Sequence, residues 1–245
     1  MFARTVVRRV TKDEAEKPFW ISFADLMTAS MVVFLIVMAV TVVVMKSQLD
    51  LLGDAAIKSH ERQIEIERFA AKVKDKSKNV RPAVKISTIK DTVRIDLGSA
   101  VSFVSGSSDI SDQGKKFLRG YIPKLLEVSR TDVGKKWLKR VVVEGFTDTD
   151  GSYLFNLNLS LQRSRKVVCA LYAPTHRNNR AMPKSELNQI RDLFLVGGYS
   201  FNSMQSSKAK SRRVELKLEF WQLGEKEMFE KLPKPDLSSK EFGKC

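Results

Sequence analysis

The longest apolar stretch of the chain lies near its start. Residues 21–45 hold a single charged side chain, Asp25, among apolar, small and hydroxylated residues. As a helix, a stretch of this length rises about 37 Å, which is enough to cross a hydrocarbon core of about 30 Å. The pattern predicts a transmembrane helix at residues 21–45, preceded by an N-terminal segment at residues 1–20.

The residues that follow are polar and rich in helix formers. Their apolar positions recur at irregular intervals, which favours a helical linker over a coiled coil. Residues 72–90 carry seven basic side chains and one acid, Asp75, and a solvated linker explains them better than a contact with membrane or wall. Because Pro82 ends any helix, we place the linker at residues 46–82 and the domain boundary at Pro82.

Strands and helices alternate beyond this boundary. Val93, Ile95 and Leu97 repeat with the period of a strand, and a helix is expected from Ser111 as N-cap. A short buried strand at 141–143 runs into Gly145. Further helices are expected from Ser160 and from Ser185 to Gly197, and 214–220 alternates as a last strand.

This order of elements predicts an α/β sandwich at residues 83–222, in which helices pack on one sheet. Residues 223–245, with two prolines among charged side chains, are expected to form a loosely held C-terminal tail. The sequence thus predicts a membrane anchor, a linker, one folded domain and a tail, in this order.

The charge of the chain is strongly positive and unevenly placed. The 43 basic and 28 acidic residues give a net charge of +15, of which residues 46–245 carry +14. Five basic residues lie in the 20 residues before the apolar stretch and three in the 20 after it, so the N-terminus is expected in the cytoplasm. Positive charge outside the cytoplasm argues against nucleic acid as a binding partner and favours wall polymer or lipid headgroups. A basic surface that only keeps the domain soluble explains the charge equally well.

Cysteine and histidine are scarce. Two Cys and two His exclude zinc ribbons, iron–sulfur spacings and multi-disulfide scaffolds. No nucleophile, phosphate-loop or zinc-protease motif occurs, so we expect no enzyme, no metal and no cofactor. Cys169 and Cys245 would share an oxidising compartment, where they could pair; the alternative is a buried Cys169 and a free Cys245.

Asp25 is the first candidate for chemistry. A carboxylate at the centre of a transmembrane helix raises the free energy of membrane insertion by roughly 2.5–3.5 kcal/mol, so it usually faces protein or water. Ser22, Thr28 and Ala29 lie three or four positions from Asp25, and small residues at this spacing favour helix packing. We expect Asp25 to couple protons, with sodium as an alternative ion, unless it lies close enough to the headgroups to be merely solvated.

The second candidate is the loop after the 141–143 strand. It concentrates polar side chains, including Asp148 and Asn156, and leads into a helix that bears Arg163. Asp148 can receive an ammonium group while Arg163 grips a carboxylate, which suits a zwitterionic ligand. An internal salt bridge between Asp148 and Arg163 is the alternative.

Residues 141–168 resemble the core motif of OmpA-like peptidoglycan-binding domains. Residues 145–148 read Gly-Phe-Thr-Asp and residues 155–164 read Phe-Asn-Leu-Asn-Leu-Ser-Leu-Gln-Arg-Ser. Residues 103–107 and 211–215 are similar to the family's Phe-x-x-Gly-Ser entry and to its closing Arg-Arg-Val-Glu strand. The resemblance covers roughly residues 84–221.

The resemblance implies that Asp148 and Arg163 hold the zwitterionic end of diaminopimelate in the wall peptide. Thr147 belongs to the same motif, and Asn156 and Leu159 would line the pocket. The sequence departs from the pattern in three places, because Phe146 replaces a frequent His, Ser164 replaces Ala, and residues 174–185 lengthen one connection.

Residues 18–29 resemble the ion-carrying helix of stator B subunits, and most closely that of the Zorya anti-phage defence B subunits. They read Pro-Phe-Trp-Ile-Ser-Phe-Ala-Asp-Leu-Met-Thr-Ala. The resemblance implies a dimeric B subunit in the bacterial inner membrane, with a periplasmic domain on peptidoglycan and a polytopic A-type (ZorA-like) partner around Asp25. Proton passage would drive a motor in anti-phage defence. A flagellar-type stator subunit and a passive membrane-to-wall tether are the alternatives.

Overall fold

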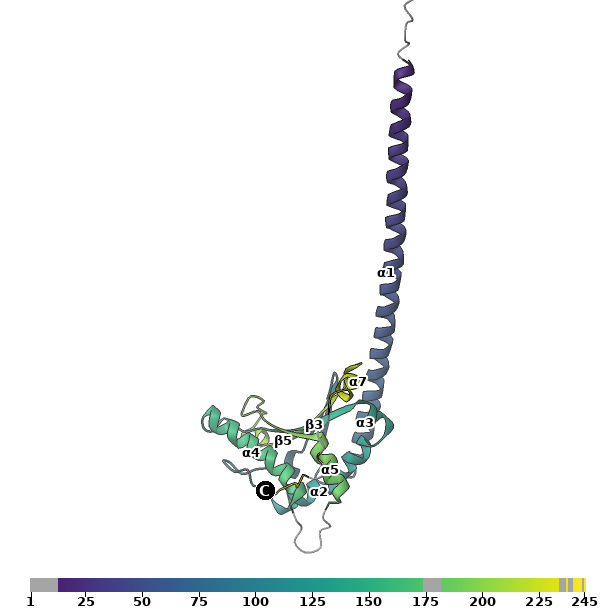
Figure 1. Cartoon of the computed structure of the whole chain (residues 1–245). Helices are drawn as coiled ribbons and strands as arrows, with labels where there is room; N and C mark the ends of the chain where they lie inside the picture. Colours follow the sequence, from purple (N-terminus) through teal and green to yellow (C-terminus); the bar gives the residue numbers. More distant parts are fainter. Residues whose placement is uncertain (1–12, 174–181, 234–236, 238–239, 244) are drawn as a thin grey trace, which may run out of the picture. The chain divides into compact units, whose positions relative to one another are not determined.

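The computed structural model describes residues 13–173, 182–233, 237, 240–243 and 245 (Figure 1). The chain divides into two compact units, Met1–Lys58 and Ser59–Cys245. The second unit therefore begins well before residue 83, where the sequence predicted the domain to start. The reason is that part of the predicted linker belongs to the core of the second unit.

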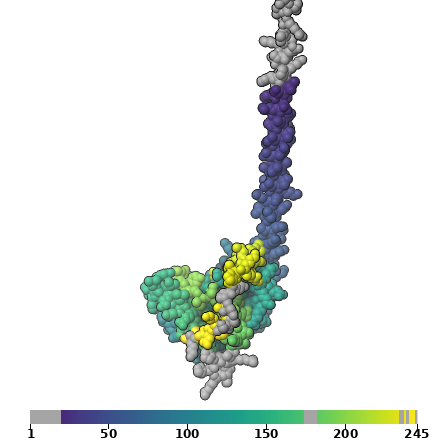
Figure 2. Space-filling model, viewed as in Figure 1, coloured from purple at the N-terminus to yellow at the C-terminus, as the bar shows by residue number. Residues whose placement is uncertain are grey.

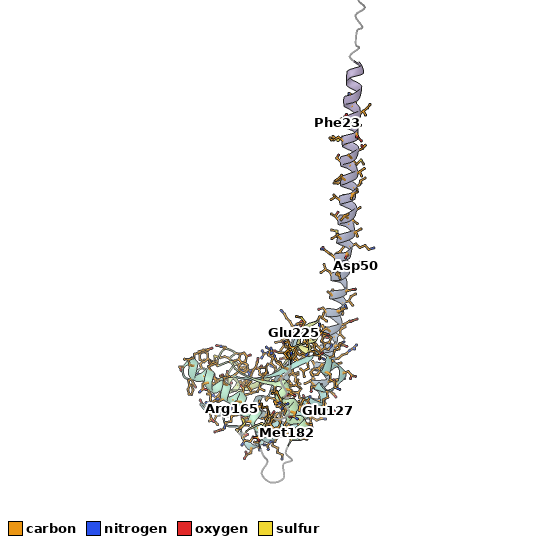
Figure 3. All side chains as sticks on the ribbon, viewed as in Figure 1. Phe23, Asp50, Glu127, Arg165, Met182 and Glu225 are labelled. Atoms are coloured by element: carbon orange, nitrogen blue, oxygen red, sulfur yellow. A yellow bond between two sulfur atoms is a disulfide. The ribbon has the colours of Figure 1, made fainter. Side chains whose placement is uncertain are left out.

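A single helix, α1, runs from Asp13 to Ser77 and includes the predicted transmembrane stretch. From Trp20 to the end of the first unit its side chains are exposed, as Phe23 and Asp50 illustrate in Figure 3. Among the described residues this is the one helix long and apolar enough to cross a membrane. The predicted helical linker is helical only as far as Ser77, so the helix ends before Pro82.

The second unit contains a five-stranded sheet with the strand order β1-β2-β5-β3-β4. β3 and β4 are parallel, and the other neighbouring strands are antiparallel. The strands are β1 (Lys85–Ile89), β2 (Thr92–Asp96), β3 (Leu138–Gly145), β4 (Phe194–Gly198) and β5 (Val214–Phe220). β5 has the predicted bounds, whereas β1 and β4 were not predicted.

Among its described residues, the second unit contains six α-helices besides the end of α1 and one short 3-10 helix, and of these α4 contacts the strands most extensively. These helices are η1 (Gly98–Val101), α2 (Asp112–Ser129), α3 (Asp132–Trp137), α4 (Tyr153–Tyr172), α5 (Lys184–Leu193), α6 (Lys208–Ser211) and α7 (Glu225–Glu230). The predicted N-cap of α2 is confirmed, because Ser111 Oγ accepts the Gly114 N–H. The mixed α/β architecture predicted from the alternating pattern is also confirmed.

Two predicted helix bounds are wrong. α4 begins at Tyr153 rather than Ser160, because Ser152 caps it by accepting the Phe155 N–H. α5 ends at Leu193, and the chain passes directly into β4, so Gly197 lies in a strand and does not stop a helix. The longer α4 places Asn156 and Leu159 on the same helix as Arg163.

The core lies between the sheet, the helices and the last turns of α1. Alternate residues of β2, β3 and β5 are buried, and α2 and α4 face them. Ile66 and Phe69 of α1 are completely buried, and the Phe69 ring packs edge-on against Phe220 at 5.4 Å. Helical spacing of Ile66, Phe69 and Val73 gives α1 one apolar side, which anchors the predicted linker in the domain.

The C-terminal tail is attached to the domain at its described positions. The Trp221 and Phe229 rings lie 5.1 Å apart, and a disulfide joins Cys169 on α4 to Cys245. In Figure 2 the yellow C-terminal residues lie on the surface of this unit. The structure thus contains the pairing that the sequence left open.

Cys245→Ser is expected to lower the free energy of unfolding of the second unit by about 2–4 kcal/mol. The disulfide closes a segment of 76 residues, and opening it increases the conformational entropy of the unfolded chain. Urea unfolding of the purified full chain measures the change. Reductant should destabilise the wild type to the same extent and leave the variant unchanged; equal stability of the two oxidised proteins would contradict the assignment.

Candidate functional site

Two glycines set the position of α4 against the sheet. A Cβ atom on Gly145 would lie 2.1 Å from the Ser160 carbonyl oxygen, and one on Gly198 would lie 2.5 Å from Leu161 Cγ. Only a residue without a side chain allows the helix to approach the ends of β3 and β4 this closely. This contact brings Asp148, just past β3, near the helix that carries Arg163.

Arg163 is completely buried and holds a neighbouring segment in place. Its Nε, Nη1 and Nη2 donate hydrogen bonds to the backbone carbonyls of Ser107, Phe146 and Val104 at 3.0, 2.9 and 3.2 Å. Burial lowers the pKa of Arg163 to about 10, against the opposing charge of Asp148. A direct contact between Arg163 and a ligand carboxylate, as predicted, would require some of these bonds to open.

Asp148 is buried and bonded to a different arginine. Its Oδ2 accepts a hydrogen bond from Arg212 Nη1 at 2.8 Å, and its Oδ1 accepts the Asp150 N–H at 3.2 Å. Burial raises the pKa of Asp148, but these two bonds and the charges of Arg212 and Arg163 outweigh it and hold the pKa below the ordinary value. The alternative of an internal Asp148–Arg163 salt bridge is not found among the described residues, where Asp148 pairs with Arg212 instead.

Two buried polar atoms, one in the loop after β3 and one on α4, lack hydrogen-bond partners in the described part of the chain. They are Thr147 Oγ1 and Asn156 Oδ1, both in side chains about 1% exposed. The Asn156 Nδ2 group, in contrast, donates to the carbonyls of Asp150 and Ser152. Buried polar groups are normally bonded, so the two orphan atoms mark a place where a water or ligand group belongs. Leu159 is buried on the same helix.

The departures from the family motif have structural roles. Phe146 is buried, with its ring 5.5 Å from Tyr199 and 4.2 Å from the Arg213 guanidinium. Ser164 Oγ donates a hydrogen bond to the Gly197 carbonyl at 2.6 Å, which ties α4 to β4. Part of the lengthened connection, residues 174–181, lies outside the described residues.

The residues that the sequence predicted for a proton site lie together on α1. Ser22, Asp25, Thr28 and Ala29 recur at helical spacing and are exposed within the first unit. The Thr28 hydroxyl bonds the helix backbone, at 3.0 Å from the Ala24 carbonyl and 2.9 Å from that of Asp25. The Thr28 hydroxyl is therefore hydrogen-bonded within its own helix.

The chain is similar over most of its length to an Escherichia coli protein. It is 42% identical over 220 residues to Zorya protein ZorB of Escherichia coli O139:H28 (strain E24377A / ETEC), covering 90% of this chain and 87% of that protein. The chain belongs to the ZorB family. No protein-family model matches it.

Two further similarities involve part of the chain. Probable lipoprotein YiaD of Escherichia coli (strain K12) is 28% identical over 148 residues, or 60% of each protein. The periplasmic domain of Helicobacter pylori MotB aligns at 15% identity with a TM-score of 0.42, covering 64% of this chain and 94% of that one. Membership of the ZorB family rests on the full-length similarity alone.

In this ZorB-family chain the sequence did not predict that Arg212 belongs to the site and pairs with Asp148. Its Nη1 holds Asp148 and its Nε donates to the Phe103 carbonyl at 3.3 Å, so it joins the loop after β3 to the segment that Arg163 also holds. The signal that could have identified it was its position in the Arg-Arg-Val-Glu stretch, residues 212–215, which leads into β5. The site therefore contains two arginines, of which Arg212 is the less buried.

Proposed function

We propose that this protein is the peptidoglycan-anchored B subunit of a proton-driven motor complex that defends bacteria against phage. Its outer domain binds the wall peptide at the Asp148 site, and Asp25 carries the proton. The observation that carries the proposal is the 42% identity to Zorya protein ZorB across both units of the chain. The subunit itself has no catalytic role in this account.

Wall binding is supported by the chemistry at the Asp148 site. Asp148 provides a negative charge for an ammonium group, and Arg212 beside it provides a positive charge for a carboxylate. Thr147 Oγ1 and Asn156 Oδ1 are buried and have no hydrogen-bond partner among the described residues, so a ligand can supply one. A stem peptide ending in zwitterionic diaminopimelate matches this set. Binding requires the Asp148–Arg212 pair to open or to shift toward the ligand.

Proton coupling is supported by the placement of Asp25 in an apolar helix. The side chains around it are exposed in the first unit, and a carboxylate there must find protein or water when the helix is in a membrane. We propose that a polytopic ZorA-like subunit encloses two copies of this helix and packs against Ser22, Thr28 and Ala29. Movement of one charge through 100 mV supplies about 2.3 kcal/mol for mechanical work.

The same proposal sets the location of the chain. The helix crosses the inner membrane once, with the N-terminus in the cytoplasm and the second unit in the periplasm. The excess of basic residues before the apolar stretch supports this orientation, and the Cys169–Cys245 disulfide is compatible with an oxidising compartment.

Thr147→Val is expected to weaken binding of the full chain to purified sacculi about threefold to tenfold, the value of one net hydrogen bond. The lost hydroxyl has no partner in the described residues, so thermal stability should not fall. Asp148→Asn should weaken binding further because it removes the charge that receives the ammonium group. Co-sedimentation with sacculi measures both effects.

Asp112→Asn is the matched control, since the Asp112 side chain is 99% exposed and lies outside the site. It should bind like the wild type. Wild-type levels of binding by both Thr147→Val and Asp148→Asn would exclude this site as the wall anchor. Intact wall binding without proton flow would favour the passive tether, and a role in motility would favour the flagellar-type subunit.

A further inference from the structure

The face of the sheet opposite the helices carries a cavity of about 520 Å³. Its walls come from β1, β2, β3 and β5 and from residues 199–205, which follow β4. Arg94, Glu144 and Glu215 line it and alternate along their strands with the core residues of the other face. Thr147, Asp148, Asn156 and Arg163 are not among the lining residues, so we call this separate cavity the open-face groove.

The floor of the open-face groove contains an incompletely bonded carboxylate. Glu144 is completely buried, and its Oε2 accepts a hydrogen bond from Arg94 Nη1 at 2.6 Å. Its Oε1 has no hydrogen-bond partner among the described residues, and Lys217 Nζ lies 4.0 Å away. Burial and the Glu144 carboxylate raise the pKa of Tyr199. A buried acceptor without a donor marks a place for a ligand group or water.

The charges around this oxygen favour a neutral donor. Arg94 also bonds Glu215 at 2.9 Å, and the other oxygen of Glu215 accepts from Arg213 Nε at 2.7 Å. The two carboxylates are therefore already matched by Arg94 and Arg213, while Lys217 pairs with Glu219 at 2.8 Å and lies 4.0 Å from Glu144. A cationic ligand would meet no excess negative charge here, whereas a hydroxyl or an amide N–H would supply the missing bond without adding charge.

The remaining lining suits a ring with many polar substituents. Ser87, Asn202, Ser203 and Gln205 both donate and accept hydrogen bonds. Tyr199 is 38% exposed, and its ring is held by the stack on Phe146. Aromatic rings present a flat apolar surface beside a polar tip, and the C–H face of a sugar ring packs against such a surface. A few placed polar groups with one aromatic wall are typical of small-molecule sites.

We infer that the open-face groove binds a neutral saccharide of the N-acetylated amino-sugar class. The acetamido N–H or a hydroxyl of the sugar donates to Glu144 Oε1, the rim amides bond the remaining polar groups, and Tyr199 packs on the ring. The saccharide can come from the glycan strands of the wall or from free oligosaccharides. In the first case the inference rests on the proposed wall-anchoring function and adds a second contact to it.

The test uses the full chain in lipid nanodiscs, titrated with tetra-N-acetylchitotetraose and followed by calorimetry. Saturable binding is expected, and Tyr199→Ala and Asn202→Ala should each weaken it at least fivefold. Asn202 is exposed, and its side chain makes no hydrogen bond to another described residue, so its replacement should leave the melting temperature unchanged. Asn158→Ala, an exposed asparagine on α4 outside the groove, is the matched control and should bind like the wild type.

Absence of saturable binding, or equal binding by wild type, Tyr199→Ala and Asn202→Ala, would overturn the inference. Maltotetraose, which lacks acetamido groups, should bind at least fivefold more weakly, and equal binding would overturn the assigned class. Reduced sacculus binding by Asn202→Ala would identify wall glycan as the source, and unchanged sacculus binding with weakened chitotetraose binding would identify a free oligosaccharide. Chitotetraose binding by Asp148→Asn at wild-type strength would separate this site from the proposed peptide site.

Discussion

Asp25→Asn is expected to abolish proton conduction through the assembled complex. Asparagine keeps the size and hydrogen-bonding capacity of the side chain but cannot take up and release a proton. Among the residues of the apolar stretch 21–45, Asp25 alone is ionisable, so no neighbour can replace it. The measurement is acidification of vesicles that contain this chain and its A-type partner, under an imposed potential. The rate should fall at least 100-fold, to that of empty vesicles.

Asp50→Asn provides the matched control for this experiment. Asp50 is an exposed carboxylate on the same helix, beyond the apolar stretch. Its replacement should leave conduction and assembly with the partner unchanged. Conduction by Asp25→Asn at the wild-type rate, with normal assembly, would show that the proton does not pass through this carboxyl group.

Arg163→Leu is expected to destabilise the second unit by about 3–5 kcal/mol, the usual cost of removing one member of a buried charged network. The change leaves three carbonyls, of Val104, Ser107 and Phe146, without their donors, and buried groups without partners are costly. Thermal unfolding of the full chain should show a melting temperature lower by about 10 °C or more.

Arg165→Leu separates this effect from a general loss of positive charge. Arg165 is exposed on the same helix, two positions away, and is labelled in Figure 3. Its replacement should shift the melting temperature by less than about 2 °C, as expected for a surface site. Similar shifts in the two variants would contradict the structural role assigned to the buried guanidinium.

The regular features of the fold followed from local sequence patterns. β5 alternates strictly between apolar and charged residues because one face packs on the core and the other carries the ion pairs of Glu215 and Lys217. Ser111 identified the start of α2 because its hydroxyl satisfies a free backbone N–H. The length and composition of the apolar stretch around Asp25 were enough to predict a helix that can span a membrane.

Features that depend on distant contacts did not follow from the sequence. The apolar side of α1 at Ile66, Phe69 and Val73 was obscured by the surrounding charged residues, so its place in the core was missed. The short strands β1 and β4 have weak patterns and lie at the edges of the sheet. Asp148 pairs with Arg212, two residues before β5, rather than with Arg163, and sequence spacing cannot distinguish two arginines that folding brings to one carboxylate.

The most direct test of the central proposal is the efficiency of phage plating on bacteria that carry the native neighbouring genes. Wild type, Asp25→Asn and Asp50→Asn are compared at matched membrane levels, with sacculus binding verified for each. The account predicts protection by wild type and Asp50→Asn, and plating on Asp25→Asn cells equal to that on cells without the genes. Full protection by Asp25→Asn, or none by the wild type, would contradict a proton-driven role in defence.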